Sequence, residues 1–70
     1  MERKEVESSN LKSIGYREDS ALLEVEFHSG AVYQYFQVPE AVYLDLMAAE
    51  SLGSYFSKNI KGKYSYEKIE

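Results

Sequence analysis

The chain has 70 residues, with 12 acids, eight Lys and Arg, and no Cys or Trp, so its formal net charge is −4. A chain of this length forms one domain, and the absence of thiols excludes a disulfide framework and a Cys-based metal site. The acidic balance argues against unspecific binding to a polyanion.

The first seven residues are charged and show no periodicity. We therefore expect a flexible N-terminal arm over 1–7 and a single domain over 8–70. No apolar stretch follows the start, which argues against a signal peptide, and no run approaches the ~20 residues of a membrane span. These features indicate a cytoplasmic protein without a membrane partner.

Three segments have the character of strands and are bounded by turn residues, at about 9–16, 21–27 and 31–36. The middle segment is the clearest, because Leu23, Val25 and Phe27 alternate with residues that include Glu24 and Glu26. Consecutive strands joined by short turns predict a three-stranded antiparallel meander.

The turn after Phe27 allows two registers. A three-residue loop with Gly30 in the left-handed conformation pairs Val25 with Tyr33 and gathers the apolar side chains, Tyr35 included, on one face. A two-residue turn shifts the pairing by one residue and places both tyrosines on the acidic face. The first register separates polar from apolar residues better, so we expect a core position for the tyrosines, whereas exposed tyrosines would offer a stacking surface for bases.

Two short helices follow the predicted sheet. Pro39 ends the sheet because it lacks an N–H, and its fixed φ suits the first turn of a helix over about 39–50, where apolar residues recur at helical spacing. Ser51 can cap a second helix over about 52–61, which Gly62 ends. The tail after residue 62 alternates weakly, as an extended run along the sheet edge would. The predicted class is α+β.

The sequence gives little support for a catalytic site or a metal-binding site. The only His, His28, lies in a hairpin turn with no Cys to activate. Glu24 and Glu26 share one face of a strand, as a row of solvent-facing acids does, and the other acids are scattered. No Gly-rich phosphate loop is present. We expect neither an enzyme nor a metal or cofactor.

The charge is unevenly spread along the chain. Residues 1–53 carry ten acids against four basic residues, a net charge of −6, whereas residues 54–70 carry four Lys against two acids, a net charge of +2. Lysines near a helix end favour the macrodipole, and the same lysines can contact phosphates. The candidate nucleic-acid-binding residues are Lys58, Lys61 and Lys63 on phosphates, Asn59 positioning them, and Tyr55 or Tyr64 as a stacking face. Tyr66 is a third aromatic neighbour of these lysines that could stack on a base.

Residues spread along the whole chain resemble the KTSC domain, named for its place at the C-terminus of some lysyl-tRNA synthetases and also found as short stand-alone bacterial proteins. They are Ser8-Ser9-Asn10-Leu11, Ile14-Gly15-Tyr16, Phe27, Gly30, Tyr33-Gln34-Tyr35, Val38-Pro39, Ser51, Gly53, Tyr55-Phe56 and Ile60-Lys61. The resemblance covers about 8–69 and departs at Ser29, where Asn or Asp is expected.

This resemblance implies a stand-alone cytoplasmic protein of bacterial or phage type. Within the family motif, Tyr33, Tyr35, Gly30 and Pro39 are expected to be structural. The synthetase connection implies RNA binding, which here would use the C-terminal Lys- and Tyr-rich segment. The alternative is a protein-interaction or homo-oligomerisation module without nucleic acid, because ten aromatics in so short a chain could form an interface with itself or another protein.

Overall fold

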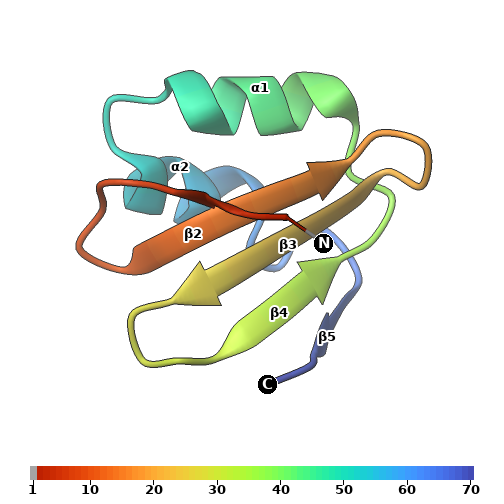
Figure 1. The fold of residues 1–70 in the computed structure, drawn as a ribbon. Helices are drawn as coiled ribbons and strands as arrows, with labels where there is room; N and C mark the ends of the chain where they lie inside the picture. Colours follow the sequence, from red (N-terminus) through yellow and green to blue (C-terminus); the bar gives the residue numbers. More distant parts are fainter. Residues whose placement is uncertain (1) are drawn as a thin grey trace.

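The computed structural model describes residues 2–70 as a five-stranded antiparallel sheet with two helices on one face (Figure 1). In order across the sheet the strands are β1 (Lys4–Glu5), β2 (Leu11–Arg17), β3 (Leu22–Phe27), β4 (Val32–Tyr35) and β5 (Tyr66–Lys68). The helices α1 (Glu40–Ala48) and α2 (Leu52–Asn59) lie between β4 and β5 in the chain. Neither of them is long and apolar enough to cross a membrane.

The predicted α+β class, the central meander and both helices are confirmed, but the count of three strands is wrong. Lys4 pairs with Ile14, so part of the segment predicted as an arm forms an edge strand. Tyr66 pairs with Tyr35, which places the C-terminal tail along the opposite edge. Both added strands are two or three residues long and contain charged residues, as edge strands commonly do because short charged edges resist pairing with other chains.

The hairpin between β3 and β4 adopts the three-residue loop. Val25 lies opposite Tyr33, and the N–H of Phe27 donates to the carbonyl oxygen of Ala31 over 2.9 Å. Gly30 has a φ of +96°, in the region that glycine enters without steric cost. The first of the two registers is therefore the correct one.

The helices cover the apolar face that this register creates. The ring of Tyr43 on α1 stacks on Tyr16 of β2 with centroids 4.7 Å apart, and the Tyr16 hydroxyl donates to the carbonyl oxygen of Val38 over 2.6 Å. Phe56 on α2 packs edge-on against Phe27 of β3. The buried core comprises Leu11, Ile14, Leu23, Val25, Tyr35, Val38, Leu46, Phe56 and Ile60.

The helix ends follow the sequence signals. The Ser51 hydroxyl accepts a hydrogen bond from the Ser54 N–H over 3.2 Å at the start of α2, as predicted. Pro39 stands immediately before α1, and Gly62, with a φ of +78°, lies just beyond the end of α2. Each helix thus begins and ends within two residues of its predicted bounds.

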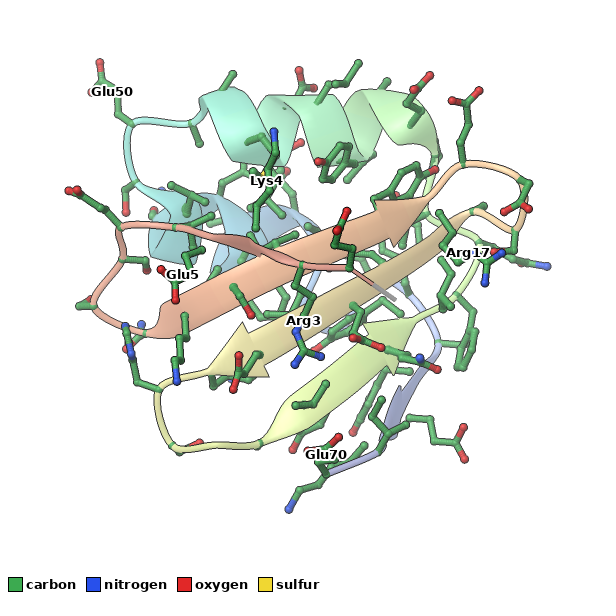
Figure 2. All side chains as sticks on the ribbon, in the orientation of Figure 1. Arg3, Lys4, Glu5, Arg17, Glu50 and Glu70 are labelled. Atoms are coloured by element: carbon green, nitrogen blue, oxygen red, sulfur yellow. The ribbon has the colours of Figure 1, made fainter. Side chains whose placement is uncertain are left out.

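The helix-free face of the sheet carries a polar network rather than a row of solvated acids. Glu24 is only 5% exposed; it pairs with the guanidinium of Arg3 and accepts a hydrogen bond from Gln34 over 2.8 Å. Figure 2 shows Arg3 reaching across this face in front of β3. Glu26 accepts from the Ser13 hydroxyl over 2.8 Å, and this bond lowers the pKa of the Glu26 carboxyl. The segment before β2 thus covers acids that were expected to face solvent.

Replacing Gly30 by Ala should destabilise the fold by about 1–2 kcal/mol, because a Cβ at this backbone conformation is strained although nothing lies within 4 Å of it. Urea unfolding measures the change. Gly53→Ala is the matched control: its Cβ makes ordinary contacts at 3.5 Å, and helix propensity should leave stability unchanged or raise it by up to about 1 kcal/mol. Equal effects of the two substitutions would contradict the assigned loop.

Replacing Arg3 by Ala should cost about 1–3 kcal/mol, because it leaves the buried Glu24 carboxylate with fewer partners. Arg17→Ala breaks an exposed pair with Asp19 and should cost less than about 1 kcal/mol. Urea unfolding of both variants makes the comparison. A stability loss no larger at Arg3 than at Arg17 would show that the network does not hold β1 in place.

Burial, with the nearby Tyr33 and Tyr66, raises the pKa of Tyr35 to about 12. Below pH 10 both states keep this proton; between about 10 and 12 the unfolded chain loses it while the folded chain keeps it, so unfolding becomes easier as the pH rises. Tyr35→Phe should therefore lose less stability than the wild type between pH about 10 and about 12. Parallel losses in urea unfolding would show that Tyr35 titrates normally.

Candidate functional site

A pocket of about 660 Å³ opens on the helix-covered side of the sheet. It lies between the β3–β4 hairpin, α2, the loop before β2 and the first residue of β5. We call it the aromatic pocket. Its lining consists of Ser9, Asn10, Leu11, Phe27, His28, Ser29, Ala31, Tyr33, Tyr35, Gly53, Phe56, Ser57, Lys61, Gly62 and Tyr66.

Five aromatic rings in this lining form a closed circuit of contacts. Phe27 meets Tyr33 edge-on at 5.6 Å between centroids, and Tyr33 lies 5.7 Å from Tyr66. Tyr66 lies 5.7 Å from Tyr35, and Tyr35 meets Phe56 edge-on at 5.4 Å. Phe56 closes the circuit 5.6 Å from Phe27. The strand register creates most of this cluster, because Tyr35 lies opposite Tyr66 across the β4–β5 pair.

The rings differ in how much of each reaches solvent. Tyr35 is 4% exposed and belongs to the core, as predicted, and Tyr33 is half-buried against it. Tyr66 is 59% exposed, although it contacts both of the other tyrosines. The pocket therefore has a rigid aromatic base and one ring with open surface.

The polar part of the lining is neutral or basic. Lys61 supplies an ammonium group, and the other polar lining residues are Ser9, Asn10, His28, Ser29 and Ser57. The His28 Nε2–H donates to the carbonyl oxygen of Ser8 over 2.8 Å, since a carbonyl can only accept, and this bond fixes the ring.

None of the residues that line the aromatic pocket is acidic, in a chain with 12 acids. A smaller hollow of about 290 Å³ is bordered by Glu7 and Glu50, and Gly53 lines both hollows. The electrostatics of the aromatic pocket thus favour a neutral or anionic group, unlike those of its neighbour.

The predicted lysines are all exposed at the end of α2. Lys58 lies in its last turn, where it complements the helix dipole, and Lys61 and Lys63 lie in the following turn. Only Lys61 also lines the aromatic pocket. The three lysines remain candidates for phosphate contacts, and Lys61 connects them to the pocket.

The other predicted binding residues have structural contacts. The Asn59 side chain donates to the carbonyl oxygen of Tyr55 over 3.2 Å, within the last turn of α2. Tyr55 and Tyr64 are half-buried against the core, and neither lines the aromatic pocket. Burial, with Asp45 and Tyr64 nearby, raises the pKa of Tyr55. The structure thus separates these two tyrosines from the aromatic pocket.

Of the three tyrosines that the sequence offers as stacking neighbours of the lysines, Tyr66 alone lines the aromatic pocket, because β5 pairs it with Tyr35. Other pocket residues were not selected from the sequence. The sequence pattern indicated core positions for Phe27 and Phe56, and Asn10 was named only among the residues that resemble the family. The available signal was the alternation of Tyr64 and Tyr66, which becomes informative once the tail is placed beside β4.

The model of the KTSC domain family matches residues 7–64. A small protein of Stutzerimonas stutzeri is 44% identical, and the match covers the full length of both chains. The lysine–tRNA ligase of Nostoc punctiforme is 44% identical over 63 residues, which are 90% of this chain but 11% of that protein. The chain thus spans about a tenth of the length of the ligases it matches.

A solved structure has the same fold. The crystal structure of a KTSC domain protein from Yersinia pestis superposes with a TM-score of 0.96 at 42% sequence identity, covering 99% of this chain and 97% of the other. Together with the family match over 7–64, this agreement confirms the resemblance that the sequence motifs indicated. The chain belongs to the KTSC domain family.

Proposed function

We propose that this protein binds single-stranded RNA through the lysine-rich segment at the end of α2, residues 58–63. The observation that carries the proposal is the double position of Lys61, which is exposed among the lysines of this segment and also lines the aromatic pocket. Proteins that bind single strands without strong sequence preference combine a cationic path for the backbone with aromatic rings for the bases. Both parts meet at Lys61.

The charge distribution supports this choice of surface. Residues 54–70 carry a net charge of +2 in a chain of −4. Lys58, Lys61 and Lys63 would contact phosphates, while Asn59 holds the last turn of α2.

The kinship with lysine–tRNA ligases agrees with an RNA partner, since those relatives carry the name of an RNA substrate. Aromatic side chains usually stack on unpaired bases, because the bases of an A-form duplex are already stacked on one another inside the helix. A single strand, an RNA end or a loop therefore suits this surface better than a duplex. Interaction with another protein or with a second copy stays a prediction.

Binding should weaken steeply with salt. Three phosphate contacts on single-stranded RNA predict a slope of about −2 for log K against log salt concentration. Fluorescence anisotropy with a labelled RNA oligomer measures the slope. Replacing Lys58, Lys61 and Lys63 together by Ala should bring it close to zero.

The matched control removes the same charge elsewhere, with Lys4, Lys12 and Arg17, all exposed, replaced by Ala. This variant should keep the slope of about −2. Equal weakening by both triple variants would point to net charge rather than to a surface. No RNA-dependent signal at about 50 mM salt and micromolar protein would end the proposal.

A further inference from the structure

We propose that the aromatic pocket holds one unstacked nucleobase, with the adjoining phosphate on Lys61. This inference rests on the proposed function for the source of the nucleotide, and it adds the group that the pocket recognises. The volume of about 660 Å³ lies in the range of small-molecule sites, about 300–1,000 Å³.

The first argument is the aromatic surface. A base has a flat π-face whatever its identity, and stacking on an aromatic ring needs such a face left open. Tyr66 offers one, being 59% exposed while its ring is held at 5.7 Å from both Tyr33 and Tyr35. The other rings of the circuit are buried or half-buried and form the support.

The second argument is electrostatic. A nucleotide presents a neutral base and an anionic phosphate in fixed proximity. The aromatic pocket matches this pair, because its lining has a lysine and no carboxylate, whereas the carboxylates of Glu24 and Glu26 lie on the opposite face of the sheet. An occupant with a cationic side chain would find no acid in this lining.

The third argument is preorganisation. The backbone around Tyr66 is fixed by hydrogen bonds from the Phe36 N–H to the Ser65 carbonyl oxygen over 2.9 Å and from the Ile69 N–H to the Val32 carbonyl oxygen over 2.8 Å. A base that stacks on Tyr66 therefore has little backbone to order, and more of the stacking energy appears as affinity.

Nucleotide titrations followed by NMR of the aromatic ring signals test this inference. AMP and CMP are added to millimolar concentration, and ribose 5-phosphate, which has the phosphate but no base, is the control ligand. The nucleotides should move the ring signals of Phe27, Tyr33 and Tyr66 in a saturable way. Ribose 5-phosphate should leave these ring signals unchanged.

Tyr66→Ala should weaken AMP binding by about 5- to 150-fold, the range for loss of one stacked base. Tyr66→Phe keeps the ring and should retain wild-type affinity within about twofold. Leu44→Ala, a change at an exposed apolar residue of α1 outside the pocket lining, should leave affinity unchanged. Unfolding of Tyr66→Ala in urea alongside the wild type shows whether the fold is kept. If it is not, the titration of the wild type decides the question, because only a base in the pocket moves the ring signals with AMP and not with ribose 5-phosphate.

The outcomes separate the two proposals. In the first case RNA binds with a slope of about −2, but AMP leaves the ring signals unchanged or Tyr66→Ala binds AMP as tightly as the wild type. Either result would overturn the base pocket and would still support the RNA-binding surface. Saturable AMP binding without RNA binding would establish the pocket as a nucleotide site and overturn only the RNA surface.

Ring signals that move with protein concentration alone would show that a second copy covers the pocket, and would overturn the inference. Failure of both AMP and CMP to move the rings would also overturn it.

Discussion

The register of the β3–β4 hairpin decides which side chains share a face of the sheet. It depends on one backbone conformation, that of Gly30, whose φ of +96° closes a three-residue loop. A shift of one residue would exchange the faces of every side chain on β4, because successive residues of a strand point to opposite sides. With the observed register, Val25 and Tyr33 lie side by side under the helices, and Glu24 lies beside Gln34 on the other face.

The polar network on the helix-free face and the aromatic cluster on the helix-covered face both result from this β3–β4 pairing. Because Glu24 points away from the helices, it needs partners on the helix-free face, and Arg3 and Gln34 supply them. Because Tyr33 and Tyr35 point toward the helices, they are available to Tyr66 when β5 adds to the edge. The N-terminal strand therefore completes the acidic side, and the C-terminal strand completes the aromatic pocket.

Much of the fold could be predicted from local patterns. The alternation in β3, the loop at Gly30 and the cap at Ser51 each express a physical preference of adjacent residues, and the structure confirms all three. The edge strands could not be predicted in the same way, since Lys4–Glu5 and Tyr66–Lys68 are too short for periodicity and are defined by partners distant in the chain.

The same limit applies to the candidate site. Lysines near the end of a helix are visible as a cluster in the sequence, and Lys61 was selected on that basis. The aromatic pocket combines residues from the loop before β2, the hairpin, α2 and β5, which only the long-range pairing brings together. Tyr66 in particular carries no local signal that separates it from Tyr64, and its contact with Tyr35 depends on which strand the tail joins.

The separation of the faces also explains how an acidic chain can contain a pocket whose lining has a lysine and no carboxylate. The Glu24 and Glu26 carboxylates lie on the helix-free face, where Arg3 pairs with both, and neither residue lines the pocket that contains Lys61. Local charge, rather than the formal −4, sets the potential in the aromatic pocket, and the sheet keeps the Glu24 and Glu26 carboxylates away from it.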